Sequence, residues 1–392
     1  MFKERVQQQW LGNVKKDIFG GLVTSVTLIP EVIGFAIIAG IHPMLALFAS
    51  VISLLVTSFA GGRPAMVTAA AGSMAVVMAP LIKDHGIPYM VAATLLTGVI
   101  QILLGFAGVH KLMRFVSPCV LAGFVNGLAI IIFMSQAGQL PGLPVLELAI
   151  VAGTVFLMVV LPRLIKSVPP ALICIVIGTL LSALSGLDLK TVGHLGDMSG
   201  SLPLPQLPAV PFNWTTFYII APVAVALSVV GLAETLVTLP LIDDLTDSQG
   251  DQPREVKGQG LANLVSGVFG CQAGCAMIGQ AVMNVKSGGR KRFSTLTAGL
   301  VLLLMIVALK DVVLNHIPTA ALIGIMIIVA FETFNWQSVR KIKGGPVTES
   351  ITMVVTTAVT AITSNLAIGI VVGIALDKFL TFAAGRLRQK PR

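Results

Sequence analysis

Apolar runs, separated by short polar or glycine-rich stretches, follow one another along the chain from residue 18 to residue 384. An apolar helix of about 20 residues crosses the roughly 30 Å hydrocarbon layer of a bilayer, and its backbone hydrogen bonds are satisfied internally there. The pattern therefore predicts an all-α polytopic membrane protein. The fourteen expected segments lie at 18–40, 43–60, 68–82, 88–108, 115–136, 146–162, 169–186, 217–240, 258–270, 277–286, 293–309, 319–335, 348–363 and 365–384.

The distribution of charge agrees with these segments. Of the 392 residues, 55% are hydrophobic and 11% are charged, whereas a soluble domain carries roughly 25% charged residues. With both termini in the cytoplasm, nearly all of the 26 Lys and Arg residues fall in cytoplasmic loops, as the positive-inside rule requires. Only Lys83, Lys190 and Lys310 fall outside, and Lys378 lies within the last segment. The net charge of +9 therefore reflects membrane topology, and no nucleic acid partner is expected.

The segments divide into two sets of seven around a proline-rich polar stretch. Because seven crossings is an odd number, the two halves have to lie in opposite orientations, which is the inverted-repeat architecture of many secondary transporters. We expect a first repeat at 18–186, an extracytoplasmic linker at 187–216 and a second repeat at 217–384. Residues 1–17 predict a cytoplasmic interfacial helix on the lipid surface, and residues 385–392 predict a basic cytoplasmic tail.

The third and tenth segments are too short to span the bilayer and are interrupted by glycine. The third follows the turn at 61–64, and the tenth follows the stretch at 270–274. Such segments at corresponding places in two halves indicate a midplane binding site, because the N-terminus of each half-helix carries about half a positive charge and unpaired N–H groups. Two such ends would attract an anion without Lys or Arg. The alternative is that both are glycine-rich packing helices.

Two glutamates lie inside apolar segments at equivalent places in the two halves. Glu31 follows Pro30 in the first segment, and Glu234 lies in the eighth. Ionisable residues within a membrane are functional candidates, and loss of hydration favours the neutral carboxyl. Protonation beside an anion site would remove a repulsive charge, which is the logic of proton symport. The alternative is that each carboxylate caps a broken helix. Phe35, one turn after Glu31, could form a wall of the site.

Other kinds of chemistry find little support in the sequence. Cys271 and Cys275 are four residues apart, but no cluster of His or carboxylate residues accompanies them, so no metal is expected. The acidic stretch at 243–251 does not match a calcium-binding loop. There is no nucleotide-binding motif and no paired nucleophile and base. We therefore expect neither an ATP-driven pump nor an enzyme, and no cofactor.

Four stretches of the sequence closely resemble the SulP family anion permeases, the bacterial relatives of animal solute carrier family 26. They are IPEVIGFAIIAG at 29–40, GFVNG at 123–127, GQGLAN at 258–263 and NVKSGGR at 284–290. The resemblance implies a fourteen-helix fold of core and gate domains, a homodimer, and an elevator-like movement of the core in a bacterial inner membrane. Segments 1–4 and 8–11 would form the core, and segments 5–7 and 12–14 the gate.

Carried over by position, the family's substrate pocket falls on the first, third and tenth segments, and its coupling position falls on Glu234 in the eighth. Glu31 is a second candidate for proton coupling. Many animal members carry a basic residue at the position of Gln280, and its absence here weakens an inference of chloride exchange. The substrate-binding residues that the resemblance implies are Glu31, Phe35, Gly72, Ser73, Met74, Ile278, Gly279 and Gln280.

The function we expect first is proton-coupled symport of a small anion, with carboxylates such as a dicarboxylate or bicarbonate ahead of sulfate. Open alternatives are an exchanger of sulfate or another anion, a sodium-coupled bicarbonate symporter, an anion channel, and a nucleobase-proton symporter of related fold. That last relative normally has an acid near the tenth segment, where residues 277–283 hold none. Family members usually continue into a cytoplasmic STAS domain, which is absent from this chain because it stops at Arg392; both a trimmed chain and a member without the domain are open alternatives.

Overall fold

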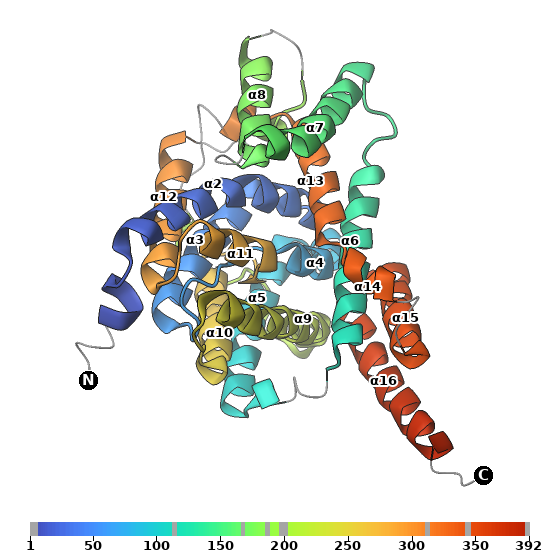
Figure 1. The fold of residues 1–392 in the computed structure, drawn as a ribbon. Helices are drawn as coiled ribbons and strands as arrows, with labels where there is room; N and C mark the ends of the chain where they lie inside the picture. The colour runs from blue at the N-terminus through green and yellow to red at the C-terminus, as the bar shows by residue number, and fades with distance from the viewer. Residues whose placement is uncertain are drawn as a thin grey trace.

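The computed structural model describes residues 7–111, 116–165, 169–184, 189–195, 203–309, 314–341 and 346–388, and these residues are mostly helical (Figure 1). The first half contains a π-helical turn (Gln7–Leu11), α2 (Val14–Ala39), α3 (Pro43–Ala60), β1 (Thr68–Ala69), α4 (Gly72–His85), α5 (Ile87–Phe106), α6 (Pro118–Ala137), α7 (Val145–Leu164) and α8 (Pro170–Leu184). The second contains α9 (Trp214–Thr246), α10 (Gln252–Val268), β2 (Cys275–Ala276), α11 (Ile278–Lys286), α12 (Arg292–Leu309), α13 (Thr319–Thr333), α14 (Trp336–Lys341), α15 (Val347–Thr363) and α16 (Leu366–Arg388). Short 3-10 turns occupy Val192–Leu195 and Leu314–His316.

Each of the fourteen expected segments contains one helix, which confirms the predicted fold class. By length and composition, seven described helices are able to cross a membrane: α2, α3, α5, α6, α7, α9 and α16. Several predicted stretches lie partly outside the described residues: 1–6 of the interfacial helix, 115 and 185–186 of two segments, 187–188 and 196–202 of the linker, and 389–392 of the tail.

Two boundaries differ from expectation because of local capping. Helix α10 begins at Gln252 rather than near residue 258, since the Asp251 side chain accepts a hydrogen bond from the Arg254 amide (3.0 Å) and a proline occupies the first turn. Helix α9 continues to Thr246 and ends where Asp247 adopts a left-handed conformation (φ 49°). The short helix α14 was not expected.

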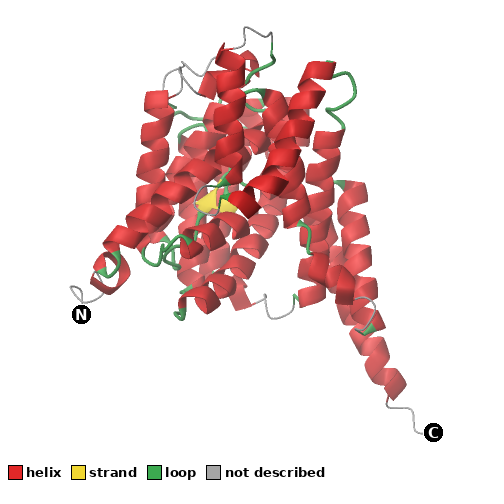
Figure 2. Cartoon of the chain, turned by 45° about the horizontal axis from the view of Figure 1, so that its top comes forward, coloured by secondary structure: helices red, strands yellow, loops and turns green. Residues whose placement is uncertain are grey.

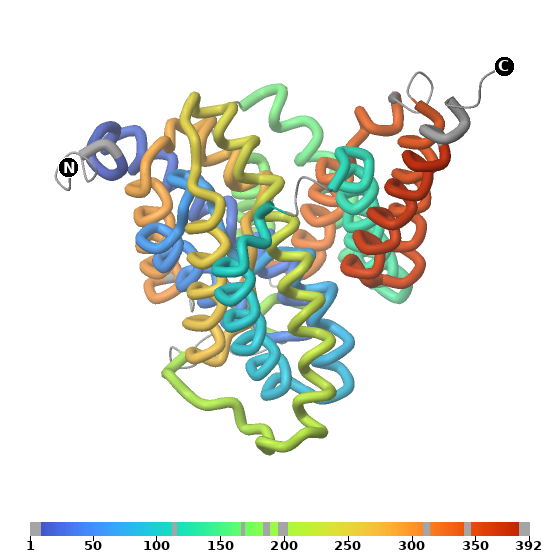
Figure 3. Tube along the Cα trace, turned by 90° about the horizontal axis from the view of Figure 1, so that it is seen from below, coloured from blue at the N-terminus to red at the C-terminus, as the bar shows by residue number. Residues whose placement is uncertain are grey.

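The helices pack as two bundles that Figure 3 shows side by side. The core bundle consists of α2–α5 and α9–α12, and its closest pairs are α10 with α5, α12 with α2, and α12 with α3. The gate bundle consists of α6, α7, α8, α13, α15 and α16, with α15 against α6 and α13 against α7. Fewer contacts join the bundles, chiefly α13 and α8 against α2, α16 against α9, and α6 against α4. The residue boundaries of these domains remain a prediction.

Glycines let the helices of the core bundle approach closely. A Cβ atom added to Gly98 of α5 would lie 2.5 Å from the Leu264 amide nitrogen, and one added to Gly260 of α10 would lie 2.9 Å from the Gly98 carbonyl oxygen. Helices in lipid associate through such close backbone packing, because burial of apolar side chains offers little gain there. Close backbone packing at glycines therefore stabilises the core bundle, in addition to the packing of its apolar side chains.

The two short strands meet near the middle of the molecule, where Figure 2 shows them in yellow. They pair antiparallel, with Thr68 opposite Ala276 and Ala69 opposite Cys275. Each strand comes from an equivalent place in its half of the chain, and each is followed at once by a short helix, α4 or α11. The pairing therefore joins the two inverted repeats at their centre.

Candidate functional site

The site is built around the N-termini of the two short helices, α4 and α11. Helix α4 begins after Ala71, and α11 begins after Met277, each in an extended conformation at the end of its strand. No side chain of either capping residue accepts a hydrogen bond from the helix. The first amides of a helix lack partners within it, and the helix dipole adds about half a positive charge there. Each short helix thus offers an anion-binding end inside the core bundle.

Buried side chains hold the strands that precede these helix ends. The Ser50 hydroxyl accepts a hydrogen bond from the Ala70 amide (3.1 Å). On the other strand, the Asn263 side chain accepts one from the Gly274 amide (2.8 Å), and the Thr235 hydroxyl accepts one from the Ala276 amide (3.2 Å). Because irregular backbone in a membrane has to find partners inside the protein, these side chains fix where α4 and α11 begin.

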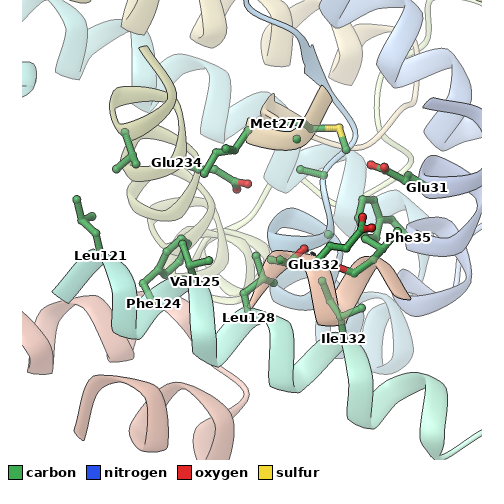
Figure 4. Close-up of a pocket in the computed structure, with 17 residues that line it drawn as sticks. Glu31, Phe35, Leu121, Phe124, Val125, Leu128, Ile132, Glu234, Met277 and Glu332 are labelled. Atoms are coloured by element: carbon green, nitrogen blue, oxygen red, sulfur yellow. Dashed lines mark hydrogen bonds between the residues drawn. The ribbon is translucent and has the colours of Figure 1, made fainter. Parts of the chain in front are cut away.

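A cavity of about 260 Å³ lies between the core and gate bundles in front of the two helix ends (Figure 4). On its core side it is lined by Glu31, Phe35, Ala71, Gly72, Glu234, Val237, Met277, Ile278 and Gly279. On its gate side it is lined by Leu121, Phe124, Val125, Leu128, Ile132, Val329, Glu332 and Thr333. None of the described residues that line it is Lys, Arg or His, so among them the helix ends are the main source of positive potential.

Glu234 of α9 is tied to both short helical regions. Its Oε2 atom accepts a hydrogen bond from the Ser73 hydroxyl in the first turn of α4. The same oxygen accepts one from the Cys275 thiol of β2, with Sγ and Oε2 3.1 Å apart. One oxygen of Glu234 is thus the shared acceptor for a donor from each half of the site. The charge of Glu234 therefore acts on both halves of the site together.

Glu31 of α2 takes part in a second series of side-chain hydrogen bonds. The Gln280 side-chain amide donates to Glu31 Oε1 (2.8 Å), and the Gln280 oxygen accepts from the Thr27 hydroxyl (2.8 Å). Both of these hydrogen bonds join the Gln280 side chain to residues of α2, and Gln280 is buried, with an exposed fraction of 3%. Glu31 and Glu234 lie on opposite sides of the cavity in Figure 4.

The structure brings Glu31, Phe35, Gly72, Glu234, Ile278 and Gly279 to the cavity wall. Ser73 and Gln280 are not among the cavity-lining residues, and their side chains bind the two glutamates. Met74 is fully buried, and its methyl group would contact a Cβ atom placed on Gly231. Substrate binding by these residues remains a prediction.

Three features of the site were not predicted from the sequence: Glu332, the contact of Cys275 with Glu234, and the apolar wall of α6. Glu332 carried an available signal, because it is an acid inside the expected segment 319–335. The partnership of Cys275 with Glu234 had no such signal, since it depends on how β2 crosses α9. Within the described residues no group of three His, Cys, Asp or Glu side chains could hold a metal ion.

Two half-helices that meet at the centre of two inverted repeats, beside buried carboxylates, are the arrangement of a secondary membrane transporter. The family model described as the sulfate permease family matches residues 14–149 and 143–356. The chain therefore belongs to the sulfate permease family, whose members include named transporters of sulfate and bicarbonate.

Named relatives cover most of the chain. Putative sulfate transporter YbaR of Bacillus subtilis is 46% identical over 372 residues, which are 95% of this chain and 78% of the relative. Bicarbonate transporter BicA of Picosynechococcus is 29% identical over 364 residues, covering 84% of this chain. The match spans only 63% of that bicarbonate transporter's length.

Solved structures show the same fold. The transmembrane domain of a cyanobacterium bicarbonate transporter BicA aligns with a TM-score of 0.82 and 25% identity, covering 92% of this chain and 97% of that one. Murine solute carrier 26 family member A9, an anion transporter in the inward-facing state, aligns with a TM-score of 0.83 and 17% identity. It covers 96% of this chain and 69% of that chain. These likenesses confirm the inverted-repeat membrane fold.

Proposed function

We propose that this transporter is a proton-coupled symporter of a small carboxylate anion, such as a dicarboxylate or bicarbonate. It would work in a bacterial inner membrane with both termini in the cytoplasm. The observation that carries the proposal is the position of Glu234, whose carboxylate accepts hydrogen bonds from Ser73 and Cys275 beside both half-helices. A proton on Glu234 removes the negative charge that competes with the anion for the same positive helix ends.

The coupling follows from electrostatics at short range. An anion and an ionised Glu234 in one cavity repel each other strongly where water is scarce, so the anion binds well only when the carboxyl is neutral. Conversely, a bound anion favours proton uptake by Glu234, because linkage between two ligands is reciprocal. Proton and anion therefore bind and leave together. Glu31, which lines the same cavity, would contribute to coupling in the same way.

The cavity favours a carboxylate over sulfate. Its lining has no basic side chain to offset two full charges, and each charge brought out of water without a partner is costly. Bicarbonate carries one charge, and a dicarboxylate can bind with a shared proton. A volume of about 260 Å³ accommodates either.

The two walls also support an elevator-like movement. The core wall carries the helix ends and two glutamates, whereas the α6 part of the gate wall is apolar, from Leu121 to Ile132. An apolar wall makes few directional bonds, so the core bundle with its bound anion can slide past it at low cost. In this proposal α2–α5 and α9–α12 move against α6–α8 and α13–α16.

A second candidate is sodium-coupled bicarbonate symport, which is favoured by the similarity to named bicarbonate transporters. Exchange of sodium for choline at constant pH separates the two. Proton symport predicts unchanged uptake after the exchange, whereas sodium symport predicts its loss.

The test is uptake by the purified chain in liposomes of radiolabelled bicarbonate, fumarate, succinate and sulfate, with and without an inward proton gradient. We expect the gradient to stimulate uptake of a carboxylate, and Glu234→Gln to lose that stimulation. The matched control is Glu349→Gln, which removes an exposed carboxylate on α15 outside the cavity. If uptake is the same with and without the gradient, and the same in Glu234→Gln as in the wild type, proton coupling is wrong.

A further inference from the structure

The cavity between the core and gate bundles offers its hydrogen-bond donors on one side. On the core side these are the first amides of α4 and α11, which have no partner within their helix. Among the described lining residues the one hydroxyl belongs to Thr333 on the gate side, and it donates to the Val329 carbonyl oxygen (2.7 Å). Ser73 and Gln280 direct their side-chain donors at the two glutamates. The oxygens of a ligand therefore find donors chiefly at the two helix ends.

Most of the remaining surface of the cavity is apolar on both sides. Phe35, Met277 and Ile278 contribute apolar side chains on the core side, beside the helix ends. Opposite them, α6 presents a row of apolar side chains, which Figure 4 shows along one edge of the cavity: Leu121, Phe124, Val125, Leu128 and Ile132. Apolar atoms of a ligand gain free energy when such walls remove them from water. The cavity thus has one polar end, and its other surfaces suit an apolar group.

Three carboxyl side chains restrict where a negative group of the ligand can lie. Glu31 and Glu234 line the core side, and Glu332 lines the gate side. One ligand carboxylate at the helix ends is tolerated when Glu234 carries a proton, as in the proposed coupling. A second carboxylate would extend toward the α6 wall or toward Glu332, where it would lose hydration without gaining a donor. Protonation of that second group does not remove the cost, because a buried hydroxyl also needs a partner.

The space in front of the helix ends suits a small organic molecule. The cavity volume of about 260 Å³ is close to the lower end of the range for small-molecule sites, about 300–1,000 Å³. A Cβ atom added to Gly279, in the first turn of α11, would meet nothing within 4 Å, so the space beside this helix end is open. An inorganic anion would leave the apolar walls without a partner.

We propose that the cavity selects a monocarboxylate with a short apolar chain. Its carboxylate binds at the N-termini of α4 and α11, and its chain packs between the apolar core side chains and the α6 wall. This inference rests on the proposed function and narrows its substrate class, because bicarbonate lacks an apolar chain and a dicarboxylate has a second polar end. Apolar contacts are not directional, so the chain can leave the α6 wall when the core bundle slides.

The experiment is equilibrium binding of radiolabelled acetate, butyrate and hexanoate to the purified chain in nanodiscs, with empty nanodiscs to correct for partition into lipid. We expect the dissociation constant to fall about twofold to fourfold for each added methylene, because each one is removed from water by the apolar walls. Unlabelled succinate should compete with butyrate about tenfold less well than unlabelled butyrate does, because its second carboxylate has no donor.

Two wall variants and one control locate the bound chain. Leu128→Ala removes part of the α6 wall, so it should weaken hexanoate binding about fivefold and change acetate binding by less than about twofold. Val125→Ala should act in the same direction and serves as the test if Leu128→Ala does not fold. The matched control is Leu180→Ala, which removes an exposed side chain of α8 and should leave the binding of both acids unchanged.

The outcomes distinguish this inference from the proposed function. If affinity rises with chain length but a proton gradient stimulates uptake of no carboxylate, proton coupling is wrong and the inference stands. If the gradient does stimulate carboxylate uptake, but acetate, butyrate and hexanoate bind equally or not at all, or succinate competes as well as butyrate, the inference is wrong and coupling stands. Equal loss of acetate and hexanoate binding in the wall variants would also overturn the inference, because the wall would then affect the carboxylate end rather than the chain.

Discussion

The contact between Gly72 and Phe35 makes a sharp test of the site geometry. A Cβ atom added to Gly72 would lie 2.6 Å from Phe35 Cε1 and 2.9 Å from Cδ1. Overpacking of this kind typically costs about 1–3 kcal/mol, while alanine in place of glycine in a helix returns about 1 kcal/mol. We therefore expect Gly72→Ala to lower stability by up to about 2 kcal/mol, the net of these two effects.

The larger effect should fall on transport. Phe35 lines the cavity, and its ring has to retreat from the new methyl group, so the space in front of the α4 N-terminus shrinks. A loss of about 1.4 kcal/mol in anion binding raises the half-saturating concentration about tenfold. The assays are thermal unfolding of the purified chain and substrate dependence of uptake in liposomes.

Two further variants decide whether the contact is the cause. Gly279→Ala places a methyl group where nothing lies within 4 Å, so it should unfold at the wild-type temperature or slightly above it, because alanine favours a helix more than glycine does. The double variant Gly72→Ala/Phe35→Leu removes most of the ring and should recover uptake affinity at least in part. Wild-type stability and affinity in Gly72→Ala, or no recovery in the double variant, would refute this account of how Phe35 packs.

Two other substitutions test the polar supports of the site. Asn263→Ala leaves the Gly274 amide without its acceptor inside the core bundle and should destabilise the chain by about 1–3 kcal/mol, measured as a lower unfolding temperature than that of the exposed Glu349→Gln control. Gln280→Leu removes the donor to Glu31, so Glu31 should bind protons more readily and uptake should become less sensitive to an imposed proton gradient. Unchanged gradient dependence in Gln280→Leu, with the protein folded, would show that Glu31 takes no part in coupling.

The fold could be predicted because the patterns that indicate it lie along the sequence and do not depend on contacts between helices. Apolar run length and the alternation of basic loops locate the segments without any knowledge of which helices touch. Glycine-rich turns before α4 and α11 marked the broken segments in the same way. What the sequence lacks is the direction of each side chain around a broken helix. The contacts of Ser73 with Glu234 and of Gln280 with Glu31 therefore could not be predicted.

The hydrogen bonds that hold the two strands in place could not be predicted from the sequence. Asn263 of α10 reaches Gly274, and Ser50 of α3 reaches Ala70, through contacts between helices whose pairing no local pattern indicates. Glu332 is different, because the rule that flagged Glu31 and Glu234 applies to it equally. An acid near the end of a predicted segment resembles an ordinary interfacial residue until α13 is seen to border the cavity.

The antiparallel pair of β1 and β2 sets the spacing between the two halves of the site. Main-chain hydrogen bonds hold neighbouring strands roughly 4.8 Å apart, and α4 and α11 start within three residues of that pair. The gap between the two anion-binding ends is thus a property of the backbone. Side-chain exchanges at Glu31, Glu234 or Gln280 can alter the charge around the two helix ends, but the distance between those ends changes only if the strands themselves are rebuilt.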